Sequence, residues 1–245
     1  WRRCLKAKLY GRKLVRMTHG SLSPICLERQ GAWKKRLVKP VERLLFGLSD
    51  RVVVTGPWEA AWNRAWGMKG PFETIDLKQF FDLNRPQERP VHAKDRALHV
   101  LYLGRRHPLK GLAYLEQAVW ALNERLSLLG KSESRGIELR VVSHAVGAEK
   151  EVVWAWCDVL CLPTLSDNFG LVVAEALEHG KPVLTTDGAP AWKDEPRTDA
   201  HGRTRLVYLE GYRDGTDAQR VELLKGALGH FLADAARGAA RIVRR

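Results

Sequence analysis

The segment Asp158–Asp187 constrains the fold more than any other part of the chain. A short apolar run over residues 159–162 has the length of a buried strand. Pro163 ends that strand because proline supplies no N–H group to a sheet. A polar turn then occupies residues 164–168. The pattern therefore predicts a buried strand that delivers a polar loop to one edge of a sheet.

The polar turn leads into a predicted helix. Leu171, Ala174 and Leu177 recur about one helical turn apart, as in a helix with one apolar side. Gly180 suits the position just after the last helical residue, and Pro182 prevents the helix from continuing. A second apolar run follows and predicts the next strand. This strand–loop–helix–strand order indicates an α/β fold, which binds ligands at loops of this kind.

The loop before the helix has the chemistry of an anion site. Backbone N–H groups over residues 169–172 precede the first helical turn, and the helix dipole favours a phosphate beside them. Gly170 lets the backbone approach a ligand closely. Glu175 is placed to accept hydrogen bonds from a ribose diol, and Asp167 from a sugar hydroxyl. Two alternatives stay open: Asp167 caps the helix, and Glu175 is a solvated surface residue.

The stretch Asp167–Glu175, followed by His-Gly-Lys-Pro-Val, resembles the motif of the retaining GT-B glycosyltransferases of family 4. That family carries two glutamates separated by seven residues, and here the first is an aspartate whose reach is one methylene shorter. The resemblance implies that Glu175 holds the nucleotide ribose and Asp167 faces the donor sugar. It also implies that the donor contacts the segment between them: Asn168, Phe169, Gly170, Leu171 and Val172.

A basic turn follows another predicted strand, residues 98–103. The turn Gly104–Gly111 contains Arg105 and, five residues on, Lys110 at the start of a predicted helix. Arginine grips a diphosphate with two parallel hydrogen bonds and lysine adds a point charge. The resemblance implies that these two cations clamp the donor diphosphate. The alternative is a solvated basic turn.

The first part of the chain supplies one further candidate. His19 follows a predicted strand over residues 13–18, in the run Met-Thr-His-Gly-Ser-Leu-Ser-Pro. This run resembles the family loop in which a histidine lies near the reacting sugar. The resemblance implies that His19 orients the donor sugar or moves a proton. The alternative is a histidine at a strand end that makes a loop hydrogen bond.

The sequence predicts two Rossmann-like domains flanked by helices. We expect a partial N-terminal, acceptor-side domain over residues 1–88 and a near-complete C-terminal nucleotide-sugar domain over residues 89–245. Residues 83–97, with two prolines and mixed charge, have the composition of a linker. The chain begins at Trp1 and ends at Arg245 in mid-pattern, so we expect a fragment of a longer protein.

Positive charge is concentrated near the start of the chain. Residues 1–43 hold thirteen basic and two acidic side chains, which account for eleven of the thirteen net positive charges. A predicted helix over residues 32–48 is basic and amphipathic, which suits either a membrane surface or a core-packed helix with a solvated face. The chain lacks aromatic stacking motifs and a recognition-helix pattern, so we do not expect it to bind nucleic acid.

Other sequence features exclude several classes. No apolar run is long enough to span a bilayer. Cys157 precedes the strand over residues 159–162 and Cys161 lies near its end, and both are interpreted as buried free thiols because the four cysteines form no framework. A cytoplasmic protein, peripheral on the inner membrane face, fits best.

The combined hypothesis is a glycosyltransferase that uses a nucleotide-sugar donor and retains the anomeric configuration. The expected catalytic residues are His19, Asp167, Arg105 and Lys110, with no cofactor and no metal. The expected acceptor is a lipopolysaccharide-like glycan or glycolipid of the cell envelope. The alternative is a catalytically degenerate module of the same fold that binds a nucleotide or a polyanion.

Overall fold

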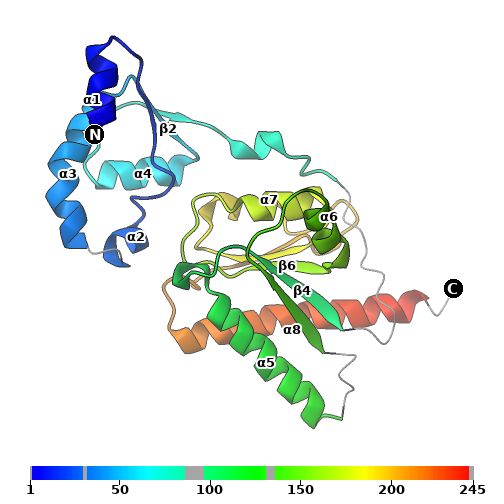
Figure 1. Cartoon of the computed structure of the whole chain (residues 1–245). Helices are drawn as coiled ribbons and strands as arrows, with labels where there is room; N and C mark the ends of the chain where they lie inside the picture. Colours follow the sequence, from blue (N-terminus) through cyan, green and yellow to red (C-terminus); the bar gives the residue numbers. More distant parts are fainter. Residues whose placement is uncertain (1, 30–31, 86–96, 131–135, 243–245) are drawn as a thin grey trace. The chain divides into compact units, whose positions relative to one another are not determined.

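The computed structural model describes residues 2–29, 32–85, 97–130 and 136–242. The chain divides into two compact units, Trp1–Gln79 and Phe80–Arg245 (Figure 1). The boundary expected between residues 88 and 89 lies outside the described residues.

The second unit is built on a parallel five-stranded sheet with the order β5-β4-β6-β7-β8. Helices α6 and α7 lie over one face of this sheet, and α5 and α8 lie over the other (Figure 1). The strands are β4 (Leu98–Leu103), β5 (Ile137–Val142), β6 (Val159–Leu162), β7 (Val183–Thr186) and β8 (Leu206–Leu209). The helices are α5 (Leu112–Leu128), α6 (Gly147–Trp156), α7 (Leu171–Glu178) and α8 (Asp217–Ile242).

The central strands are apolar because helices cover both of their faces. Every residue of β6 and of β7 is buried. Parallel strands enclosed in this way have continuous apolar sequences and lack the alternation of a half-exposed strand. The short runs in the sequence therefore become the centre of the sheet.

The strand order reverses at one point of the sheet. From β4 the chain first adds β5 on one side and then crosses to add β6 on the other. In open α/β sheets, ligands bind outside the carboxyl ends of the two strands at which the order reverses. The loops that follow β4 and β6 meet that condition, and they contain the basic turn and the polar turn singled out in the sequence.

The first unit is a smaller α/β arrangement. Its parallel sheet has the order β1-β2-β3. The strands are β1 (Val15–Met17), β2 (Arg51–Val54) and β3 (Phe72–Thr74). The helices are α1 (Arg2–Leu9), α2 (Pro24–Arg29), α3 (Ala32–Gly47) and α4 (Pro57–Ala65), with a 3-10 turn at Leu77–Phe80. The hydrophobic core of this unit contains Leu22, Phe46, Val52, Trp66 and Met68.

Helix α7 has the expected ends but a different buried side. Gly180 adopts a positive φ of 66° just beyond the helix, as its position predicted. The helix buries Val173, Ala174, Ala176 and Leu177. Leu171 is 53% exposed, so its expected place in the apolar stripe was wrong. Leu171 is the first helical residue, where the chain has only just left the loop.

Helix α3 packs by one edge over the part of it whose side chains are described. Leu45 and Phe46 are buried, whereas Leu37, Val41 and Leu44 are 71%, 44% and 58% exposed. One edge of the helix thus joins the core and a second apolar strip faces outward, while contact with a membrane stays a prediction. Within the described residues, no helix combines the length and apolar character needed to cross a bilayer.

Candidate functional site

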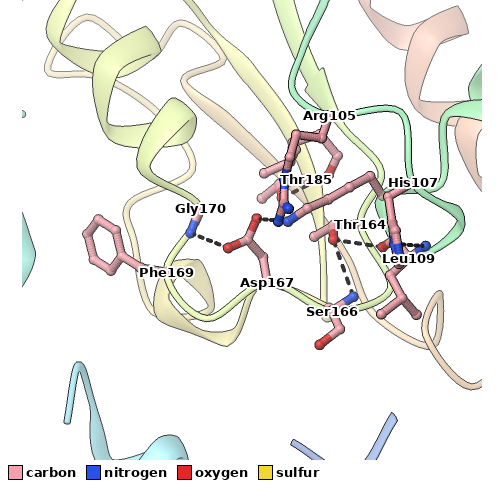
Figure 2. Close-up of polar contacts among 12 residues, drawn as sticks. Arg105, His107, Leu109, Thr164, Ser166, Asp167, Phe169, Gly170 and Thr185 are labelled. Atoms are coloured by element: carbon pink, nitrogen blue, oxygen red, sulfur yellow. Dashed lines mark hydrogen bonds and ion pairs between the residues drawn. The ribbon is translucent and has the colours of Figure 1, made fainter. Parts of the chain in front are cut away.

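The loops after β4 and β6 are joined through one backbone carbonyl. The carbonyl oxygen of Leu109 accepts a hydrogen bond from the N–H of Leu165 at 2.8 Å and another from the hydroxyl of Thr164 at 3.0 Å (Figure 2). The donors and the acceptor are buried. These hydrogen bonds therefore join the two loops at the switch point, the place between β4 and β6 where the strand order reverses.

Two glycines permit this close approach. Gly111 has a φ of 68°, and a Cβ atom there would lie 1.9 Å from the carbonyl oxygen of Pro163. A Cβ atom on Gly188, in the loop after β7, would lie 2.0 Å from the carbonyl oxygen of Thr164. The N–H of Asp167 donates to the carbonyl of Gly188 at 2.8 Å. Three loops thus meet at backbone-to-backbone distance.

The structure brings Lys110 and Asp167 together in the joined loops. Nζ of Lys110 lies 2.5 Å from Oδ2 of Asp167, and the two side chains are only 17% and 20% exposed. The other carboxylate oxygen, Oδ1, accepts the N–H of Gly170 at 3.0 Å (Figure 2). Asp167 therefore closes the turn that precedes α7 and also pairs with a cation from the neighbouring loop. Its bond goes to Gly170, the N-cap residue, and no side-chain hydrogen bond caps α7.

Arg105 lies in the same basic turn and is exposed. Its carbonyl accepts a hydrogen bond from the hydroxyl of buried Tyr102 at 2.8 Å, and this bond anchors the turn to strand β4. Burial raises the pKa of Tyr102 to about 12, so the hydroxyl stays a donor at neutral pH. Among the described residues we find no acceptor for the guanidinium of Arg105. This cation remains available to an anionic ligand.

The N-terminus of α7 is shaped by an aromatic pair. Gly170 has a φ of 73°, and the preceding Phe169 is buried against Trp192, whose indole N–H donates to the Phe169 carbonyl at 2.5 Å. The N–H of Gly170 donates to the side chain of Asp167, so this amide is already occupied by a group outside the helix. The amides of Leu171 and Val172 lie in the first turn, where helical amides have no intrahelical acceptor.

Glu175 has a partner that the sequence did not indicate. Its Oε1 lies 2.7 Å from Nζ of Lys150 on α6, and the two side chains are 26% and 27% exposed. Glu175 is therefore a half-buried member of an ion pair and differs from a solvated surface residue. Lys150 is one of many basic residues in a basic chain, and only the packing of α6 beside α7 singles it out. Asn168 is also half-buried.

His19 belongs to the first unit and is described with that unit. It follows β1, is exposed and has a φ of 48°. Its proximity to a sugar stays a prediction. Cys157 and Cys161 are buried free thiols, as expected, and burial raises the pKa of Cys157 to about 12. In the described part of the chain, no three His, Cys, Asp or Glu side chains are grouped so as to hold a metal ion.

The sequence of the second unit matches a known family model. Residues 97–211, which hold both loops of the site, match the model described as glycosyl transferases group 1. These residues are therefore similar to the domain of group 1 glycosyltransferases. A D-inositol 3-phosphate glycosyltransferase of Pseudarthrobacter chlorophenolicus is 30% identical over 172 residues, which are 61% of this chain and 40% of that protein. The enzyme of the same description from Paenarthrobacter aurescens is 28% identical over 170 residues. The chain spans about 40% of the length of these curated relatives.

Solved structures resemble the fold of the chain. Anabaena HepE in complex with UDP and glucose has a TM-score of 0.57 at 17% identity, covering 99% of this chain and 70% of HepE. Sucrose-phosphate synthase from Thermosynechococcus elongatus has a TM-score of 0.58 at 18% identity, covering 96% of this chain and 63% of the synthase. The expected α/β class and GT-B architecture, with Rossmann-like parallel sheets, are confirmed.

Proposed function

We propose that this protein transfers a sugar from a nucleotide-diphosphate sugar to a hydroxyl group of an acceptor, with retention of the anomeric configuration. The observation that carries the proposal is the contact of Lys110 with Asp167 at the switch point, beside the first turn of α7. The group 1 match over residues 97–211 supports it, as does the presence of UDP-glucose in a complex of HepE.

The cations of the site suit a diphosphate leaving group. When the bond from the anomeric carbon to the phosphate oxygen breaks, negative charge develops on the departing diphosphate. Arg105 offers paired N–H donors to this charge, and Lys110 offers an ammonium. The first-turn amides of Leu171 and Val172 add fixed donors from the helix. This stabilisation is electrostatic and requires no metal ion.

Lys110 can serve two anions at once. Its ammonium carries three N–H donors, and the contact with Asp167 uses one direction among them. The aspartate thereby fixes the ammonium, and the remaining donors face a phosphate. In the same proposal the carboxylate of Asp167 accepts a sugar hydroxyl, so donor sugar and diphosphate are recognised by adjacent groups.

Two further residues, one in each unit, have proposed roles. Glu175 accepts the hydroxyls of the nucleotide ribose, and Lys150 holds its carboxylate in place. His19 orients the donor sugar or moves a proton. Retention is proposed to follow from attack on the same face of the sugar from which the diphosphate leaves, without a protein nucleophile.

The proposed acceptor is a glycolipid or glycan of the cell envelope, similar to lipopolysaccharide. The outward strip of α3, which includes Leu37, Val41 and Leu44, is apolar in a strongly basic part of the chain. Such a strip suits the surface of an anionic membrane, so we propose a peripheral place on the cytoplasmic face. Vesicles with and without anionic phospholipid test this, and equal sedimentation with both kinds would contradict it.

A donor screen tests the central proposal. Thermal shifts with UDP, GDP and ADP sugars identify the donor, and release of the nucleoside diphosphate measures turnover. We expect Glu175→Ala to remove the thermal shift and the turnover together. A wild-type protein that binds a sugar nucleotide without turnover would favour the catalytically degenerate module. Absence of any shift would contradict both.

A further inference from the structure

The loop that carries His19 is strained. Within the described part of the chain, His19 is the one residue other than glycine with a positive φ, at 48°. The left-handed region brings Cβ close to the backbone and is unfavourable for such a residue. Strain of this kind persists only where the surrounding structure enforces it, and it concentrates at functional sites. The side chain itself is exposed, so packing of the imidazole does not enforce it.

A buried carboxylate provides the constraint. Oε1 of Glu59 accepts the hydroxyl of Thr18 at 2.6 Å and the N–H of Gly20 at 2.7 Å. These are the residues on either side of His19. Glu59 is 1% exposed, and Thr18 and Gly20 are buried. One carboxylate oxygen therefore accepts hydrogen bonds from both neighbours of His19, while the imidazole of His19 stays exposed to solvent.

The same carboxylate is anchored on the adjacent strand. Oε2 of Glu59 accepts the N–H of Thr55 at 2.8 Å and its hydroxyl at 3.0 Å. Glu59 is the third residue of α4, and Thr55 directly follows β2, so the contact resembles the return hydrogen bond of a capping box. We call these four hydrogen bonds of the Glu59 carboxylate the clamp. The clamp connects the carboxyl ends of β1 and β2 to the start of α4.

The state of Glu59 agrees with this role. Burial alone would raise the pKa of this carboxyl, but hydrogen bonds from Thr18, Thr55 and Gly20 outweigh it and hold the pKa below its usual value. The group is therefore a carboxylate at neutral pH. A charged, buried acceptor makes stronger hydrogen bonds than a neutral one and can oppose the strain at His19.

We propose that Glu59 is a positioning residue that holds His19 in its left-handed conformation and so presents the imidazole for sugar transfer. The catalytic half of this inference rests on the role proposed for His19. The clamp itself does not, since it predicts a backbone effect that is measurable without any sugar. The two halves are therefore tested separately.

The clamp is tested by a comparison of glycine with alanine at position 19. Both His19→Gly and His19→Ala remove the imidazole, but only alanine keeps the Cβ atom that the left-handed region disfavours. With Glu59 present, we expect the glycine variant to have a folding equilibrium constant about fivefold larger than the alanine variant. With Glu59→Gln, one acceptor oxygen is replaced by a donor, and we expect the preference for glycine to disappear.

A second pair of variants covers the case in which Glu59→Gln does not fold. Thr18→Val removes the hydroxyl at nearly constant shape, and Thr18→Ser retains it. The preference for glycine at position 19 should vanish in the valine background and persist in the serine background. An unchanged preference in the valine background, or in Glu59→Gln where it folds, would overturn the clamp.

The positioning role is tested by kinetics in the complete protein with UDP-glucose as the probe. We expect Glu59→Gln to lower kcat for UDP release at least tenfold, with KM and the affinity for UDP unchanged. The control is Glu42→Gln, which makes the same chemical change at the Arg16–Glu42 ion pair of the same unit and should leave kcat unaltered. An equal loss in the two variants would contradict positioning. If the wild type releases no UDP, the proposed donor or activity fails, while the stability comparison still decides the clamp.

Discussion

The ammonium of Lys150 lies 2.7 Å from Oε1 of Glu175, and this contact joins α6 to α7 beside the candidate site. Each side chain is about one-quarter exposed, so the pair lies at the protein surface but is partly shielded from water. The acid that is expected to read the ribose is therefore oriented before a ligand binds. In the proposed site, recognition of the ribose therefore depends on two helices, although the motif lies on only one of them.

Removal of the Glu175 carboxylate should weaken nucleotide binding. We expect Glu175→Gln to raise the Kd for UDP about tenfold, because a charged acceptor of two hydroxyls becomes neutral and loses one acceptor position. Calorimetry with UDP measures the change. Glu151→Gln, at an exposed position on α6, is the matched control and should bind UDP as the wild type does. Equal affinities for Glu175→Gln and the wild type would contradict the assigned role.

The charge of Lys110 should contribute more to UDP binding than the charge of Arg106 in the same turn. Lys110→Met leaves the half-buried Asp167 carboxylate without its cation beside the proposed diphosphate position. We expect affinity for UDP to fall at least about tenfold, as befits a charge-assisted hydrogen bond. Arg106→Met removes an equal charge from the same turn, but Arg106 is 62% exposed and faces Glu116 at 3.9 Å. Comparable losses in both variants would indicate a general effect of charge.

Replacement of Gly111 should disrupt the joint between the loops. Gly111→Ala places a Cβ atom 1.9 Å from the Pro163 carbonyl in addition to the cost of a positive φ. Gly202→Ala is the matched control, since Gly202 has a φ of 71° and no atom within 4 Å of the added Cβ. We expect losses in the free energy of unfolding of about 3 kcal/mol for Gly111 and about 1 kcal/mol for Gly202. Chemical denaturation measures both, and similar losses would show that the close approach is unimportant.

The first unit should be destabilised by acid through Glu59. The pKa of this group is lowered in the folded state from its ordinary value of 4.5, so the folded protein binds the proton less readily than the unfolded chain. The stabilisation is therefore complete above pH 4.5 and is lost as the pH falls through the folded-state pKa. Unfolding measured from neutral pH to well below this value should show a shallower acid limb for Glu59→Gln. An identical limb would contradict the assignment.

The core of the second unit was predictable because its signals are local. The apolar run of β6, Pro163 after it, and Gly180 beyond α7 each determine one boundary, and the structure places those boundaries as expected. The exposure of Leu171 was not predictable from helical spacing, because the first turn of α7 follows a loop whose path is set by Gly170 and Trp192.

The partners of the site residues depend on tertiary packing. Lys110 and Asp167 were both candidates, yet their direct contact arises only when Leu109 bonds the other loop. Glu59 had a detectable local signal, since it stands two residues after a proline at a helix start. The residues around Glu59 in the sequence do not indicate that its carboxylate accepts hydrogen bonds from Thr18 and Gly20, which lie about forty residues earlier.

The hydrogen bonds to the carbonyl of Leu109 should make the two loops as rigid as neighbouring strands of a sheet. The amides of Leu165 and Asp167 are engaged across loops, and they should exchange their hydrogens with solvent as slowly as strand amides do. An incoming phosphate then meets a surface whose shape already exists. The favourable free energy of its contacts is not offset by the entropy of ordering two loops, so even a small fragment such as pyrophosphate should bind measurably on its own.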